Sequence, residues 1–163
     1  MPPMRKFLKV ASAFLLTLFA GVQFVRPARV NPPVVAGQSI EELAPLPQDV
    51  SKVLNRSCMD CHSNRTVWPW YSNVSPVSWF LKGHVDDGRR HLNFSRWARY
   101  DLRERAVLLN EICRTAKGGA MPLSSYTLIH RDAVLKTSDV STLCRWSGDE
   151  QRHLTSLATP YAR

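Results

Sequence analysis

Cys58 and Cys61 are separated by two residues, and His62 follows the second cysteine directly. Two thiols at this spacing can each form a thioether with one vinyl group of a haem, which leaves the adjoining histidine beneath the iron as an axial ligand. The pattern therefore predicts one covalent haem c per chain, with Cys58 and Cys61 as attachment points and His62 as the proximal ligand.

Two other kinds of site use a pair of cysteines at this spacing. A thiol-disulfide site places the pair where a strand meets a helix in a βαβ unit, and the sequence has no such pattern. A zinc site could use Cys58, Cys61 and His62, but Cys113 and Cys144 do not form a second closely spaced pair. Haem is therefore the favoured cofactor.

Met121 is the favoured ligand for the opposite face of the haem. It follows Gly118-Gly119-Ala120, where a flexible backbone can approach a flat ring closely, and it precedes Pro122, which fixes the chain direction. A thioether opposite a histidine gives the His/Met pair of electron-transfer cytochromes. The plain alternative is an ordinary core methionine. Weaker candidates for the ligand are His84, His91, His130, His153 and Lys136.

Aromatic residues are dense just after the cysteine motif. Trp68, Trp70 and Tyr71 are expected to wall the haem edge and exclude water from it. Tyr126, which follows Met121 by about one turn, could pack over the haem edge or bond a propionate. Ordinary core packing is the alternative for this aromatic cluster.

Residues 1–26 have the character of an export segment. Arg5, Lys6 and Lys9 precede an uncharged, mainly apolar run from Val10 to Val25. Counted from Phe7 and Leu8, the apolar region is about 19 residues long. As a helix it would span about 28 Å, close to the thickness of a bilayer core. A cleaved signal peptide is the alternative. No clear small-x-small cleavage site follows the run, so a membrane-spanning signal anchor is favoured.

The composition of residues 27–47 indicates a Pro-rich linker. It would be an extended, semi-rigid tether or a simple leader loop. Residues 48–163 then form the haem domain. Apolar residues recur there at helical spacing, and no alternating strand pattern is evident. The expected fold is all-α, with four or five short helices around one haem.

Several residues mark the expected helix ends. Ser75 and Pro76 should be the N-cap and first residue of a helix that ends near His91. Asp101 should cap the next long helix, which Gly118 and Gly119 end. A short helical segment should run from Pro122 to Ile129. The last helix should run from Ser138-Asp139 to Trp146, with a separate turn from Gly148.

Cys113 and Cys144 remain once the motif has taken its pair of cysteines. Both lie on expected helices, and an oxidising compartment would favour a disulfide that ties the two helices together. Two buried free thiols are the alternative.

The formal net charge of the chain is +9. A basic surface can attract nucleic acid, anionic lipid or an acidic protein. The basic residues are interspersed with apolar and acidic ones and form no polybasic run, so nucleic acid is not an expected partner.

Several unusual motifs occur in a fixed order in residues 48–147. They are the Cys58–His62 motif, Trp68-Pro69-Trp70-Tyr71-Ser72, Ser75-Pro76-Val77-Ser78-Trp79, Gly88-Arg89, Leu92-Asn93-Phe94-Ser95, Met121-Pro122-Leu123-Ser124-Ser125-Tyr126, His130 and Leu143-Cys144-Arg145-Trp146. In these segments the chain resembles the bacterial haem-binding domain family, a cytochrome-c-like group. The resemblance implies a cytochrome-c-like all-α fold, with His62 as proximal and Met121 as distal ligand.

These features together predict a membrane-tethered cytochrome of the bacterial inner membrane whose haem domain faces the periplasm. It would carry single electrons between redox partner proteins rather than act as an enzyme. If the leader is cleaved, the domain would be released into the periplasm. The alternative is a haem peroxidase or a gas or redox sensor, which would need a displaceable distal Met121.

Overall fold

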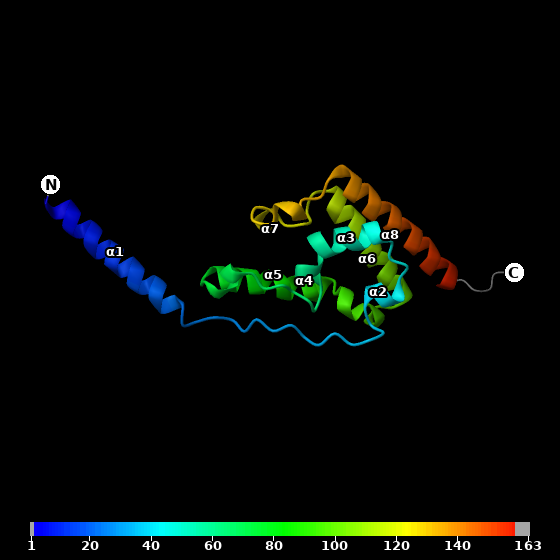
Figure 1. Ribbon diagram of the computed structural model, residues 1–163, viewed down its shortest axis with the longest axis horizontal. Helices are drawn as coiled ribbons and strands as arrows, with labels where there is room; N and C mark the ends of the chain where they lie inside the picture. The colour runs from blue at the N-terminus through cyan, green and yellow to red at the C-terminus, as the bar shows by residue number, and fades with distance from the viewer. Residues whose placement is uncertain (1, 159–163) are drawn as a thin grey trace.

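The computed structural model describes residues 2–158, where every regular element is a helix and no strand is present (Figure 1). The all-α prediction is confirmed. Four helices of ten or more residues follow the N-terminal segment, and short helices of three to six residues lie between them. In chain order the elements are α1 (Pro2–Val22), α2 (Ile40–Leu43), α3 (Gln48–Ser57), α4 (Met59–His62), η1 (Trp70–Asn73), α5 (Val77–His91), η2 (Phe94–Arg99), α6 (Leu102–Lys117), α7 (Ser124–Thr127), η3 (Arg131–Ala133) and α8 (Thr137–Ala158).

The core lies where α6 and α8 pack side by side and α3 packs against α8 (Figure 1). Buried side chains of η2 belong to the same cluster. Each helix contributes apolar residues at helical spacing, such as Val50, Val53 and Leu54 on α3. Trp97 from η2 and Leu109 from α6 are almost fully buried in the same cluster. Burial of this apolar surface is the main force that holds the short helices together.

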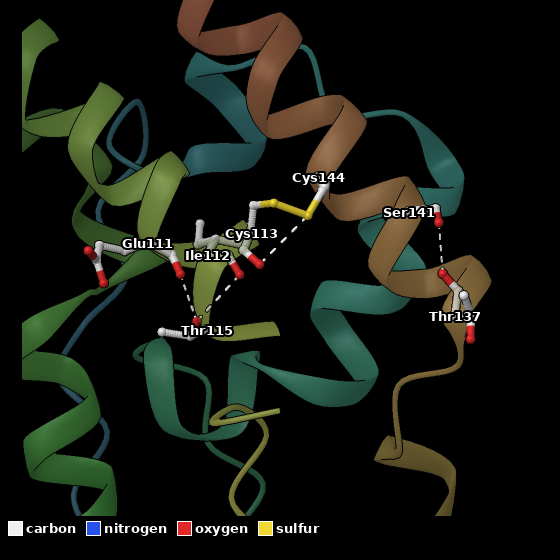
Figure 2. Close-up of a disulfide and its surroundings, with 7 residues drawn as sticks. All are labelled: Glu111, Ile112, Cys113, Thr115, Thr137, Ser141 and Cys144. Atoms are coloured by element: carbon white, nitrogen blue, oxygen red, sulfur yellow. Dashed lines mark hydrogen bonds between the residues drawn. A yellow bond between two sulfur atoms is a disulfide. The ribbon is translucent and has the colours of Figure 1, made fainter. Parts of the chain in front are cut away.

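A disulfide joins Cys113 on α6 to Cys144 on α8 (Figure 2). The two Cα atoms are 4.6 Å apart, because the helices are packed in direct contact. The crosslink lies beside Ile112 and Leu143, which belong to the buried core. It therefore fastens the two longest helices of the haem region to each other.

The start and end of α6 confirm the predicted helix signals. The Asp101 side chain accepts a hydrogen bond from the Glu104 backbone N–H at 2.8 Å, and the Glu104 carboxylate accepts one from the Asp101 N–H at 2.9 Å. Each bond satisfies a backbone donor that a helix start would otherwise leave unpaired. At the other end Gly118 is the C-cap and Gly119 has a φ of +70°, which few other residues adopt.

Two helix boundaries differ from the prediction. Pro76, rather than Ser75, is the N-cap of α5, because the Ser75 hydroxyl bonds the Val25 carbonyl and the Ser78 hydroxyl instead. Helix α8 continues through Gly148 to Ala158, where a separate turn was expected. Trp146, Glu150 and Leu154 are buried on one face of it, and this packing outweighs the cost of about 1 kcal/mol for one glycine in a helix.

Residues 2–22 form helix α1, which extends away from the rest of the molecule (Figure 1). The expected membrane-spanning helix is not found, since no helix within residues 2–158 is long and apolar enough to cross a bilayer. Arg5, Lys6 and Lys9 all lie inside α1. The uncharged part that remains, residues 10–22, would span about 20 Å, short of a core of about 30 Å.

Residues 23–39 form an extended strap that lies against the helical domain. The Gln23 side chain makes two hydrogen bonds with the Ser75 backbone, at 2.9 and 3.0 Å. Asn31 donates to the Thr66 carbonyl at 2.9 Å. The strap leads into α2, where Ile40 is completely buried in the core. Contacts of this kind, between segments far apart in the sequence, were not predicted.

Candidate haem site

The cysteine motif forms a single turn between two helices. Cys58 ends α3, where its N–H donates to the Leu54 carbonyl, and it also begins α4. The N–H groups of Cys61 and His62 both donate to the Cys58 carbonyl, at 3.2 and 3.0 Å. Met59 is buried in the core and pins the turn to the domain. The two thiols and the imidazole are therefore held within one turn of backbone.

Neither motif cysteine forms a disulfide within the described part of the chain. Burial raises the pKa of the Cys58 thiol to about 12, and burial together with the Asp60 carboxylate raises that of Cys61 to about 11. Thiol-disulfide exchange sites instead have a cysteine of lowered pKa. Among residues 2–158 no group of three or more His, Cys, Asp and Glu side chains is arranged to hold a metal ion. These features do not favour the redox-thiol or zinc alternatives.

His62 has one ring nitrogen paired with the protein and one left for a ligand. Its Nδ1 lies 3.1 Å from the Leu92 carbonyl oxygen. Since a carbonyl can only accept, Nδ1 carries the proton, and Nε2 then has a free lone pair. Burial lowers the pKa of His62, which favours the neutral ring that a metal ion requires. This arrangement of a histidine held by a backbone carbonyl is typical of metal ligands in proteins.

A buried polar network fixes the segment that provides the Leu92 carbonyl. Asn93 donates to the Asn64 side chain at 2.9 Å and accepts from the Ser95 N–H at 3.0 Å. The Ser95 hydroxyl in turn accepts from the Asn64 N–H at 3.0 Å. All three residues are buried, so every one of these bonds is protected from water. The network ties the residues just after the motif to the segment that orients His62.

Gly88 allows α5 to press against the motif. A Cβ atom at this position would lie 2.6 Å from the Cys61 carbonyl oxygen. At that distance the backbone would have to move to accommodate any side chain. The next residue, Arg89, donates to the Ser63 carbonyl at 2.8 Å and to the Thr66 hydroxyl at 2.8 Å. It also reaches Val30 and Asn31 in the strap. Its guanidinium thus joins α5 to the segment after the motif and to the strap.

Two adjoining cavities of about 380 and 310 Å³ open beside the motif. Both are bordered by Cys58, His62 and Met121. The larger one is mainly apolar, and its lining includes core residues from η2, α6, α8 and the segments just before η2 and α8: Leu92, Phe94, Leu108, Ile112, Ala116, Leu135 and Leu143. The smaller one is bordered by residues of the motif, of α5 and of the segment around Tyr126.

These cavities fit a haem. An apolar lining suits the porphyrin, Nε2 of His62 is available to iron, and Met121 offers a thioether at the same cavities. Cys58 and Cys61 border the smaller cavity together. The predicted residues Cys58, Cys61, His62, Met121 and Tyr126 are thus brought together.

The other predicted aromatic residues lie elsewhere. Trp68, Trp70 and Tyr71 are outside the lining of both cavities. Trp70 has 77% of its surface exposed, and Trp68 donates to Asn31 in the strap. Tyr71 contacts His130 instead. The clustering of aromatic residues in the sequence did not indicate which of these rings would face the cavity.

Two of the weaker ligand candidates border the cavities. His84 and His91 lie two turns apart on α5, and the ring of His84 packs edge-to-face against Phe80. His91 is exposed, and its Nδ1 is paired with the Asp87 carbonyl. His153 is paired with Glu150 on α8, outside both cavities. The helical spacing of His84 and His91 on α5 was the signal that could have placed both rings on one side.

The fold and the site define an all-α protein with a Cys-x-x-Cys-His turn that opens onto a pair of apolar cavities. The model of the haem-binding domain family matches residues 17–149, and the chain therefore belongs to the haem-binding domain family. The match begins within α1 and includes the strap and α2. No curated protein and no solved structure gives a significant match.

Proposed function

We propose that the protein is a c-type cytochrome that carries single electrons, with a cytochrome-c-like arrangement of helices around the haem. Cys58 and Cys61 form the two thioethers, His62 is the proximal ligand and Met121 is the distal ligand. The observation that carries this proposal is the pairing of His62 Nδ1 with the Leu92 carbonyl at cavities that Met121 also borders. Bound haem supplies the one-electron chemistry between ferrous and ferric iron.

The chain's own residues would position and shield the cofactor. The Leu92 carbonyl keeps the imidazole of His62 in one orientation and one tautomer. Phe94, Ile112 and Leu143 exclude water from the larger cavity and keep the local polarity low. A thioether ligand and an apolar surrounding both favour the ferrous state and so raise the reduction potential. These are the properties of an electron carrier rather than of a catalyst.

We propose that the haem domain is exported to the bacterial periplasm. Arg5, Lys6 and Lys9 before an apolar run have the character of an export signal. The disulfide between Cys113 and Cys144 agrees with an oxidising compartment. In this proposal the exposed apolar side chains of α1 contact the inner membrane, and the electron donor and acceptor are other proteins.

A second function is favoured by one observation. Met121 is 37% exposed, and it follows a glycine of positive φ on a segment with little core packing. A distal ligand that can leave would open a site for a small molecule, as gas sensors and peroxidases need. In that case His84 and His91, which border the smaller cavity, would be candidate acid–base groups.

Absorption spectra of the haem-bearing protein separate the two functions. As an electron carrier, the ferric protein should show the Met–iron charge-transfer band, and the ferrous protein should bind carbon monoxide slowly. Met121→Leu, which keeps the volume and removes the sulfur, should abolish the band and accelerate binding. Leu128→Ala, an exposed residue of the same segment, should change neither. Rapid carbon monoxide binding by the wild-type protein would contradict the carrier function and support the sensor.

A further inference from the structure

The segment that carries Met121 is not held by the hydrophobic core. Helix α7 follows Met121 by three residues, and none of its four residues, all of which the structure describes, is buried. Leu128 and Ile129, the next two residues, are 64% and 59% exposed. The position of Met121 must therefore depend on other contacts.

The first of these contacts lies at the end of α6. The N–H groups of Ala120 and Met121 both donate to the Thr115 carbonyl, at 2.9 and 3.2 Å. Gly119 between them and the helix has a φ of +70°, so the chain turns sharply there. This contact fixes where the segment begins, but it leaves the direction of the following residues open.

The second contact joins the far part of the segment to the cysteine motif. The Tyr126 hydroxyl donates to Asp60 Oδ2 at 2.8 Å. Asp60 is itself held, because its Oδ1 accepts from the Val67 N–H at 3.0 Å and its carbonyl accepts from the Thr66 hydroxyl at 2.6 Å. Asp60 lies between the two motif cysteines, so this bond connects the two sides of the smaller cavity directly.

The third contact braces Tyr126 from behind. The rings of Tyr126 and His130 are stacked with centroids 4.2 Å apart, and the His130 N–H donates to the Tyr126 carbonyl at 3.0 Å. His130 Nε2 lies 2.6 Å from the Tyr71 hydroxyl, which belongs to η1. Tyr71 and Asp60 thus hold the segment from two different elements.

We propose that Asp60, Tyr71, Tyr126 and His130 form a latch that positions Met121 at the haem. The four are positioning residues, since they act on the haem through the segment that carries Met121. The latch rests on the proposed function in so far as Met121 is the distal ligand. While the latch is closed, Met121 stays at the cavities. When it opens, the segment can swing about Gly119 and leave the distal side free.

The latch can be tested with Tyr126→Phe and Tyr71→Phe in the haem-bearing full-length protein. Each variant keeps its ring and loses only the hydroxyl, so large effects on folding are not expected. Hydrogen exchange of residues 121–130, followed by mass spectrometry, should become about tenfold faster in Tyr126→Phe, because a hydrogen bond to a carboxylate is lost. Carbon monoxide binding to the ferrous protein should accelerate by a similar factor, and the Met–iron band should weaken.

Ser125→Ala is the matched control, because Ser125 lies exposed on the same short helix. It should leave exchange, carbon monoxide binding and the Met–iron band as in the wild type. Asp60→Asn, which keeps one acceptor oxygen of two, should give an intermediate rate. Unchanged exchange of residues 121–130 in both tyrosine variants would overturn the latch. The Met–iron band of the wild-type protein tests Met121 ligation by itself, so the two proposals fail separately.

Discussion

The two sides of the cavity are built in different ways. On the side of His62 the motif is backed by the buried core, by the Asn64–Asn93–Ser95 network and by close contact with α5 at Gly88. On the side of Met121 the chain has an exposed single-turn helix held by a few polar and ring contacts. One side is therefore part of the folded core, and the other is attached to it.

This difference separates two tasks of a haem site. Under the proposed function, the attachment side must be rigid, since two thiols and an imidazole would have to meet one cofactor within one turn of chain. The Met121 side would determine whether the sixth position on iron is filled, and a few contacts are enough to set that equilibrium. Substitutions on the first side should therefore change folding, and those on the second should change ligation.

The largest expected contrast is in stability. Leu54→Ala removes a completely buried side chain from α3, next to the motif, and should lower the free energy of unfolding by about 2–5 kcal/mol. Leu128→Ala, on the Met121 side, removes an exposed side chain and should change it by less than about 0.5 kcal/mol. Urea unfolding of the two variants measures both values, and equal losses would contradict the division into two sides.

The disulfide should stabilise the scaffold that both sides share. Replacement of Cys113 and Cys144 by alanine should lower the free energy of unfolding by about 2–4 kcal/mol, because the unfolded chain gains freedom. The same loss should follow from reduction of the wild-type protein. A denaturation midpoint that does not change on reduction would show that the crosslink does not support the α6–α8 pair.

Two glycines of α5 test the close contact with the motif. Gly88→Ala would place a Cβ 2.6 Å from the Cys61 carbonyl oxygen and should cost about 1–3 kcal/mol of stability. Gly83→Ala is the control on the same helix, since no described atom lies within 4 Å of the added Cβ. It should stabilise the protein by about 0.5–1 kcal/mol through helix propensity. Equal changes in the free energy of unfolding of the two variants would contradict a close contact between α5 and the motif.

The smallest expected effect concerns the strap and its dependence on pH. Glu42 accepts hydrogen bonds from the backbone N–H groups of Gly37 and Ser39, which lower its pKa from 4.5 to about 2. A carboxyl of lowered pKa adds stability above its ordinary pKa, and this contribution is lost as the pH falls from about 4.5 towards 2.

Glu42→Gln should therefore make the unfolding free energy less dependent on pH over that window. Chemical denaturation at several pH values between 5 and 2 measures the difference from the wild type. If the unfolding free energies of the two proteins changed with pH in the same way, the Glu42 hydrogen bonds would not hold the turn at Gly37.

The sequence predicted the elements that follow local rules. The cap at Asp101 and the glycines that end α6 both depend on neighbouring residues. The haem motif is of the same kind, because its chemistry lies within five consecutive positions. These features could be recognised without knowledge of the rest of the fold.

The contacts between distant segments could not be predicted in the same way. Asp60 and Tyr126 are 66 residues apart, and Gln23 and Ser75 are 52 apart. Nothing in the local pattern of either partner indicates the other. Arg89 illustrates the same limit, since nothing near it in the sequence indicates the Ser63 carbonyl and the Thr66 hydroxyl that its guanidinium binds.

Covalent attachment at Cys58 and Cys61 is the central claim, and the mass of one tryptic peptide tests it most directly. The protein is purified from a host with c-type haem maturation and digested under denaturing conditions, which gives the peptide from Ser57 to Arg65. That peptide should carry the added mass of one haem, and the variant with both cysteines replaced by alanine should carry none. An unmodified wild-type peptide from a maturation-competent host would contradict the account.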